Sequence, residues 1–239
     1  MESMNSLEDD LKELRDTYNS GVTKTESWRR SQLKALLNLL VEKEDDILKA
    51  LQQDLGKHRA EAYRDEVGTI IKSVNFALKF LKQWMKSTKA KLPLAVFPTT
   101  AELVPEPLGL VLVISSWNFP FGLSLEPLIG ALAAGNVVVL KPSELAPACS
   151  SVLASTIHSY LDTKAVKVIQ GDVLVGQKLL QQKWDKILFT GSTRVAQAVM
   201  SAAAKHLTPV TLELGGKCPT IVDSITTSRT RENIEWPSG

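Results

Sequence analysis

Apolar residues in the first ninety positions recur at intervals of three and four, which is the spacing of one face of an amphipathic helix. One such run covers residues 28–51 and a second covers 67–85, with charged residues on the remaining faces. Gly56 follows the first run and is a typical helix end. We therefore predict a helical hairpin within residues 1–90 that packs on a larger core and carries no functional site.

The helical pattern ends in a proline-rich segment at residues 91–108. Its four prolines exclude a helix and any long central strand, because proline lacks the backbone N–H that both structures use. We predict a connector here, with a short edge strand at 100–104 and a domain boundary.

From residue 109 onward, short apolar runs alternate with helical patterns. Such runs are typical of strands that are buried on both faces of a sheet. The helices between them are long enough for crossover connections, which join parallel strands in a right-handed sense. The sequence therefore predicts an α/β fold with a Rossmann-like parallel five-stranded sheet and helices on both faces. The predicted strands are 110–115, 137–140, 166–169, 186–189 and 210–214, and the predicted helices are 121–134, 144–161, 173–182 and 193–206.

Composition limits the classes of function without changing this picture. The chain has 239 residues, is 44% hydrophobic and 23% charged, and has a formal net charge of +2, which gives no case for a nucleic-acid partner. No apolar run is long enough to span a membrane, and the acidic start resembles neither a signal peptide nor a transit peptide, so we expect a cytoplasmic protein. The two cysteines lie far apart and in no metal-binding spacing, so we expect no metal site.

Residues that could carry chemistry follow or end four of the five predicted strands. The last strand contains a carboxylate, Glu213, between two leucines and before two glycines. A charge there is costly unless it faces a cleft or has a partner, and the ligand crevice of a parallel sheet lies beyond the carboxyl ends of its strands. Residues 116–120, 141–144 and 190–193 follow three other strands, and the last segment opens a helix whose N–H groups could face a phosphate or a nicotinamide. That turn lacks the spacing of a standard dinucleotide fingerprint or a P-loop, so the prediction depends on the convergence of all four segments.

Four motifs stand in these segments: Trp-Asn-Phe-Pro at 117–120, Lys-Pro-Ser-Glu at 141–144, Phe-Thr-Gly-Ser at 189–192 and Leu-Glu-Leu-Gly-Gly-Lys at 212–217. In this order and spacing they resemble the aldehyde dehydrogenase family. The helical start and residues 206–211 are similar to class 3 of that family, of a plant-like kind, and the resemblance covers residues 8–223. It implies oxidation of a small-molecule aldehyde to a carboxylate with NAD or NADP, an NAD(P)-binding domain at 109–223, and a homodimer.

The resemblance also implies catalytic roles for two residues. Asn118 resembles the oxyanion donor, a side-chain amide that stabilises charge as the tetrahedral intermediate forms. From the sequence alone, Asn118 could instead be the N-cap of the helix that follows Pro120. Glu213 resembles the general base that activates water, a role suited to a desolvated carboxylate at a strand end. Its alternative is a structural acid bonded to backbone N–H groups.

The implied cofactor site uses residues from all four segments. Lys141 and Glu144 resemble the groups that bind the adenosine ribose hydroxyls, and a lysine there could tolerate a 2′-phosphate as well. Their alternatives are a solvated lysine and an acid in the first turn of a helix. Gly191 and Ser192 resemble the turn against the nicotinamide, and Ala196 stands where the family usually has a second glycine. The full set expected to bind the cofactor is Ser115, Trp117, Lys141, Glu144, Gly191, Ser192, Ala196, Leu214 and Gly215.

The main departure from the family concerns the cysteine thiolate that attacks the aldehyde. In the family this cysteine lies beyond the general base, and none of residues 224–239 is a cysteine. That stretch has little apolar content and no match to the family, so we expect a disordered tail and an aldehyde dehydrogenase fold truncated before its catalytic domain. Cys218 and Cys149 are weak substitutes, since a lone cysteine in an apolar context usually packs. We expect the chain to be inactive alone, with a regulatory partner of a full-length subunit or an unstable product as the alternatives.

Overall fold

A computed structural model describes residues 2–219 and 221. The expected tail at 224–239 lies outside these residues. Within them, no helix combines the length and the apolar character needed to cross a bilayer.

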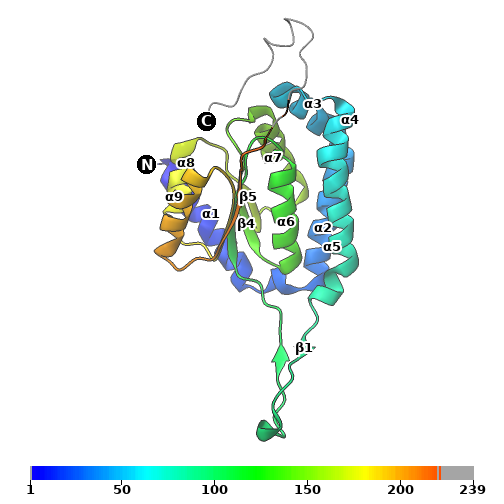
Figure 1. The fold of residues 1–239 in the computed structure, drawn as a ribbon, viewed down its shortest axis with the longest axis vertical. Helices are drawn as coiled ribbons and strands as arrows, with labels where there is room; N and C mark the ends of the chain where they lie inside the picture. Colours follow the sequence, from blue (N-terminus) through cyan, green and yellow to red (C-terminus); the bar gives the residue numbers. More distant parts are fainter. Residues whose placement is uncertain (1, 220, 222–239) are drawn as a thin grey trace, which may run out of the picture.

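The central sheet contains five strands: β3 (Leu110–Ile114), β4 (Val137–Lys141), β5 (Val166–Val168), β6 (Lys186–Gly191) and β7 (Val210–Leu214). All are parallel and lie in the order β5-β4-β3-β6-β7 (Figure 1). Strands β3 and β4 are almost fully buried, which explains their uninterrupted apolar sequence, whereas β7 is an edge strand and is partly exposed. The predicted fold class is confirmed.

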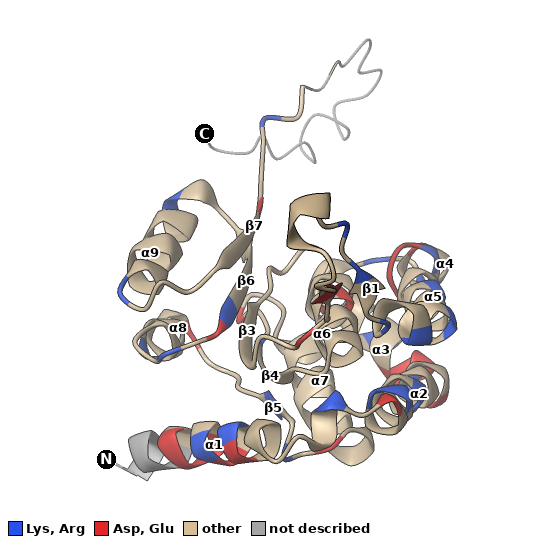
Figure 2. Ribbon diagram, turned by 90° about the horizontal axis from the view of Figure 1, so that it is seen from below, with Lys and Arg blue, Asp and Glu red and all other residues tan. Residues whose placement is uncertain are grey.

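Two pairs of helices cover opposite faces of this sheet. Helices α6 (Gly122–Ala134) and α7 (Pro147–Tyr160) lie on one face, and α8 (Val173–Leu180) and α9 (Thr193–Ala204) lie on the other (Figure 2). The chain reverses its direction across the sheet between β5 and β6, so the neighbours β3 and β6 lead into helices on opposite faces. Doubly wound sheets bind ligands at such a switch point.

The N-terminal region contains more helices than the two of the predicted hairpin. Helix α2 packs on α5, α6 and α7, and α5 packs on α6, so both predicted helical runs cover the α6 and α7 side of the sheet. The elements in this region are η1 (Val22–Lys24), α2 (Glu26–Glu42), α3 (Glu44–Leu55), α4 (Arg59–Ala62), the π-helical turn η2 (Tyr63–Val67) and α5 (Gly68–Trp84).

The prediction of one continuous helix over 28–51 is wrong. The helix is interrupted at Lys43, because three acidic residues follow it and form a favourable first turn for a new helix. Gly56 ends that second helix in the left-handed conformation, with φ 64°, as the sequence predicts.

Helix α1 (Glu2–Asn19) lies apart from this group, on the α8 and α9 side of the sheet (Figure 2). Its residues Leu11 and Leu14 are buried, and the helix contacts β3 and β4. Lys167 of β5 pairs with Asp10 at 3.1 Å and with Glu13 at 2.7 Å. The expectation of a lone hairpin missed this helix because its buried residues pack on strands that are distant in the sequence.

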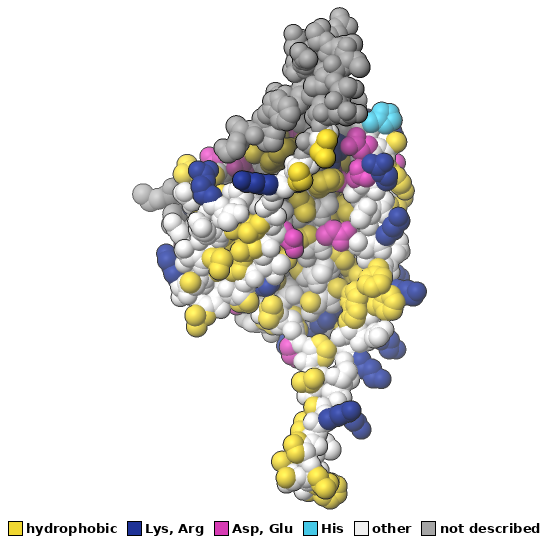
Figure 3. Space-filling view, in the orientation of Figure 1, with side chains coloured by type: hydrophobic (Ala, Val, Ile, Leu, Met, Phe, Trp, Pro, Cys, Tyr) yellow, Lys and Arg dark blue, Asp and Glu magenta, His cyan; other side chains and the backbone are white. Residues whose placement is uncertain are grey.

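An antiparallel arm extends from the body of the molecule (Figure 1). It pairs β2 (Glu102–Leu103) with β1 (Thr88–Lys89), and the short helix η3 (Leu94–Val96) lies between them. The short strand expected at 100–104 is confirmed, but its partner at 88–89 falls inside the range predicted to be helical. Apolar side chains on the arm are exposed, including Leu94 and Phe97 (Figure 3).

Candidate active site

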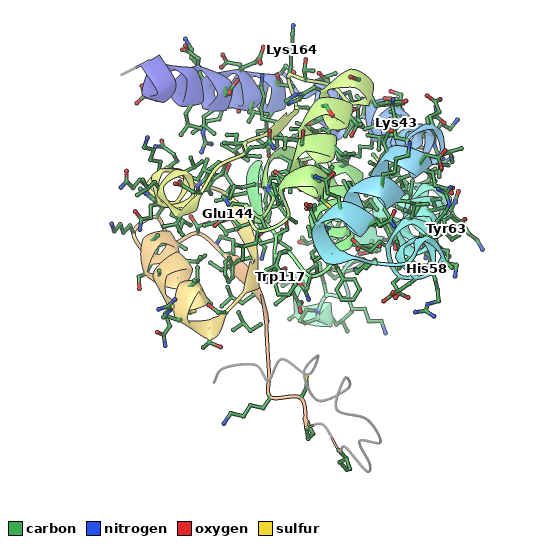
Figure 4. The ribbon with its side chains drawn as sticks, turned by 90° about the horizontal axis from the view of Figure 1, so that it is seen from above. Lys43, His58, Tyr63, Trp117, Glu144 and Lys164 are labelled. Atoms are coloured by element: carbon green, nitrogen blue, oxygen red, sulfur yellow. The ribbon has the colours of Figure 1, made fainter. Side chains whose placement is uncertain are left out.

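The four sequence segments with candidate chemistry meet at one edge of the sheet. The register pairs Ile114 at the end of β3 with Lys141 of β4 and Phe189 of β6, and it pairs Gly191 with Leu214 of β7. Their carboxyl ends therefore lie side by side. Figure 4 looks onto this edge and shows Trp117 and Glu144 near its centre, between α8 and α9 on one side and the N-terminal helices on the other.

Lys141 and Glu144 form an ion pair at the end of β4. The Lys141 ammonium is buried and donates to Glu144 Oε2 at 2.6 Å and to the Pro142 carbonyl at 3.2 Å. Partial burial raises the pKa of Glu144, but hydrogen bonding by Lys141 and the backbone, with the lysine charge, outweighs this and lowers the pKa overall. The carboxylate is therefore ionised and still exposed to solvent.

Both alternatives for this pair are wrong. Lys141 is not a solvated lysine, because its side chain is only 6% exposed. Glu144 is not in the first turn of a helix, because α7 begins at Pro147 and not at residue 144. The proline at that position fits the first turn of a helix, where its missing N–H has no partner to lose.

Asn118 lies in the exposed loop between β3 and α6. Its side-chain Oδ1 accepts a hydrogen bond from the Ser116 hydroxyl at 2.6 Å, which turns the amide so that Nδ2 is the free donor. Within the described residues, Nδ2 donates to no acceptor. Asn118 is not the N-cap of α6, because Phe121 occupies that position, so this alternative is wrong.

The other two candidates from this loop differ in access. The Ser115 hydroxyl is buried and forms a 2.7 Å hydrogen bond with the Ser124 hydroxyl, so its side chain connects the end of β3 to α6 in this structure. Trp117 is 48% exposed at the edge of the sheet.

The segment after β6 combines a close turn with a helix start. Ser192 is the N-cap of α9, and its hydroxyl accepts from the Val195 N–H at 3.3 Å. A Cβ on Gly191, the last residue of β6, would lie 2.6 Å from the Phe189 ring, so the glycine leaves room for that ring at the strand end. Ala196 is buried in α9, and its expected contact with a cofactor stays a prediction.

Glu213 lines a cavity of about 440 Å³ on the α5 and α6 side of the sheet edge. Thr190 lies opposite Glu213 in the parallel register and lines the same cavity with Phe119. The expectation that Glu213 is desolvated is wrong for the described residues, because β7 is the edge strand and the carboxylate is exposed. Its alternative, an acid bonded to backbone N–H groups, finds no such bond among these residues. Leu214 and Gly215 are also exposed.

The candidate groups divide between the two sides of the sheet edge. Lys141 extends toward α8, since its Cε would lie 4.0 Å from a Cβ on Gly176. The Glu213 cavity lies on the opposite side, between β6, β7, α5 and α6. A ligand that crosses the edge can therefore contact the Lys141 pair on one side and Glu213 on the other.

Neither cysteine is among the residues that line the Glu213 cavity. Cys149 is buried in α7, where burial and the neighbouring Asp54 raise the pKa of its thiol. Cys218 is exposed beyond β7.

Two acidic residues near the site were not predicted from the sequence. Glu126 of α6 lines the Glu213 cavity, and one of its buried carboxylate oxygens has no hydrogen-bond partner among the described residues. Burial raises the pKa of Glu126 overall, and a smaller effect of Ser73 opposes it. The sequence feature that could have indicated Glu126 is its position as the one acid within the apolar helical run 121–134. Glu66 is fully buried in η2, but its neighbours Arg64 and Asp65 made the segment resemble a solvated helix face.

The sheet, its switch point and the loops at its carboxyl edge define the class of doubly wound α/β proteins, in which nucleotide ligands bind at that edge. Residues 16–228 match the sequence profile of the aldehyde dehydrogenase family, and the chain belongs to this family.

Relatives of known type place the chain in family 3. Aldehyde dehydrogenase family 3 member F1 of Arabidopsis thaliana is 52% identical over 235 residues, which are 98% of this chain and 49% of that protein. Member H1 of the same plant is 54% identical over 214 residues, 90% of this chain and 44% of the relative. A substrate-bound structure of AldH from Staphylococcus aureus superposes with a TM-score of 0.88 at 43% identity, covering 91% of this chain and 47% of that one. The chain spans about half the length of the curated relatives it matches.

Proposed function

We propose that this chain provides the NAD(P) site and two of the catalytic groups for oxidation of an aldehyde to a carboxylate. The observation that carries the proposal is the convergence of four family motifs at the switch-point edge of one parallel sheet. Enzymes of the aldehyde dehydrogenase family use NAD or NADP. When bound, the nicotinamide would accept the hydride that leaves the aldehyde carbon.

The residues present fit such a dinucleotide. The Glu144 carboxylate is ionised and exposed, so it can accept hydrogen bonds from ribose hydroxyls. The hydrogen bond from the buried Lys141 ammonium holds this carboxylate in place. Ser192 is the N-cap of α9, so the first turn of this helix lies beside the end of β6 and can present N–H groups to a phosphate.

Each catalytic candidate is assigned a separate task. Asn118 presents its Nδ2 donor toward a developing oxyanion, because Ser116 occupies the other end of the amide. Glu213 activates water from the wall of the 440 Å³ cavity, where apolar neighbours can pack against the aldehyde. The 239 residues alone bind the cofactor without turnover, since neither Cys149 nor Cys218 lines the cavity that Glu213 faces.

The ion pair at the end of β4 favours NAD over NADP. Because Glu144 pairs with the Lys141 ammonium at 2.6 Å, a 2′-phosphate would meet a carboxylate whose neighbouring lysine is already engaged. The homodimer and the cytoplasmic location expected from the sequence stay predictions.

Titration of the purified chain with NAD and with NADP, followed by tryptophan fluorescence, tests this function. We expect NAD to bind more tightly than NADP, and Glu144→Gln to weaken NAD binding about tenfold, the loss of roughly 1.4 kcal/mol of hydrogen bonding. Glu8→Gln, an exposed change on α1, is the matched control and should bind like the wild type. Absence of binding by either dinucleotide would overturn the cofactor assignment, and aldehyde-dependent NADH formation by the chain alone would overturn the assignment of inactivity.

A further inference from the structure

The loop that carries Asn118 has little packing to fix its position. Residues 117–119 are exposed, and the loop lies between the end of β3 and the start of α6. A group that stabilises an oxyanion must nevertheless be held closely, since a displacement of about 1 Å can reduce a rate about a hundredfold. Some other interaction must therefore hold the backbone of this loop.

Two residues from the N-terminal helices supply that interaction. Lys57 follows the Gly56 helix end of α3, and its ammonium donates to the Glu66 Oε1 at 2.7 Å. Glu66 is fully buried and the Lys57 side chain is 12% exposed, so the ion pair is largely shielded from water. The π-helical turn η2 brings Glu66 to this point, and such turns often occur at functional sites.

The pair contacts the loop at both ends. The Lys57 ammonium also donates to the backbone carbonyl of Asn118 at 3.0 Å and lies 4.1 Å from the centre of the Phe119 ring. Glu66 Oε2 accepts from the N–H groups of Phe121 at 2.9 Å and Gly122 at 3.1 Å.

We propose that Lys57 and Glu66 are positioning residues that hold the Asn118 amide in its productive place. The inference rests on the proposed role of Asn118 as the oxyanion donor. Capping of α6 alone would need only the two N–H bonds to Glu66, whereas the second bond of Lys57 acts directly on the carbonyl of Asn118. The ion pair thus joins the helix start and the Asn118 backbone into one fixed unit.

Backbone ¹⁵N relaxation of the purified chain without cofactor tests the proposal. We expect an order parameter at Asn118 of about 0.85 in the wild type and below about 0.6 in Lys57→Met, which keeps the chain length but removes the donors. Lys57→Arg should restore the order. Glu66→Gln, which keeps the volume and an acceptor, should loosen Asn118 less than Lys57→Met.

Lys167→Met is the matched control, because it breaks another partly buried lysine pair, with Asp10 and Glu13, far from the loop. It should lower the melting temperature while leaving the order at Asn118 unchanged. If Asn118 stays ordered in Lys57→Met, or if Lys167→Met loosens it equally, the positioning role is refuted. Because the measurement uses no cofactor, failure of NAD(P) binding would overturn the proposed function without affecting this result.

Discussion

Asp54 should stabilise a helix whose first turn it contacts 94 residues later in the chain. Helix α7 has no side-chain cap of its own: Ala146 is at its N-cap position, and its first residue is Pro147. The Asp54 carboxylate of α3 instead accepts from the N–H groups of Ala148 at 3.2 Å and Cys149 at 2.8 Å.

The expected loss in Asp54→Ala follows from these two bonds. Removing a capping acceptor costs about 1 kcal/mol, and removing a partly buried negative charge from a helix N-terminus costs roughly another 1 kcal/mol. We therefore expect the free energy of unfolding to fall by about 2 kcal/mol. For a chain of this size, that corresponds to a melting temperature roughly 4–8 °C lower.

Urea unfolding followed by circular dichroism measures this difference, with two comparison variants. Asp54→Asn keeps one acceptor oxygen and should recover about half of the loss. Asp46→Ala removes an exposed carboxylate of the same helix, 3.5 Å from Lys43, and should cost at most about 1 kcal/mol. If Asp54→Ala is no more destabilising than Asp46→Ala, the idea of capping from a distant helix is refuted.

Two further predictions concern titratable groups. A thiol reagent should modify Cys218 in the native protein and Cys149 only after denaturation, because burial shields that thiol and raises its pKa; rapid native modification of both cysteines would contradict the buried position of α7. The folded protein lowers the pKa of Glu144, so its ionised form stabilises the fold above the unfolded value of about 4.3, and this contribution is lost as the pH falls through the folded pKa. The melting temperature of the wild type should therefore exceed that of Glu144→Gln at neutral pH and approach it in acid, and a difference independent of pH would refute the assignment.

Local pattern predicted much of this architecture. Apolar runs spaced by helical segments were enough to predict five parallel strands, because strands buried on both faces of a sheet are apolar throughout and the segments between them are long enough for crossover helices. Gly56 ends a helix with positive φ, as the sequence indicated. The alignment of the four chemical motifs at one edge followed from parallel pairing alone.

The tertiary fold determined which charged side chains are buried and which groups they bind, and the local sequence pattern did not predict this. Glu66 and Asp54 bind N–H groups at helix starts that lie 55 and 94 residues away, and each looks like an ordinary acid in an amphipathic helix until the fold brings the helices together. Likewise, Glu213 is exposed among the described residues, where β7 is the edge strand, a position that depends on strand order and not on its apolar sequence. The sequence by itself determined the elements and the edge where the chemistry gathers. Only the tertiary structure decided which charges are buried and which backbone groups they bind, because burial and hydrogen bonding depend on neighbours that are distant along the chain.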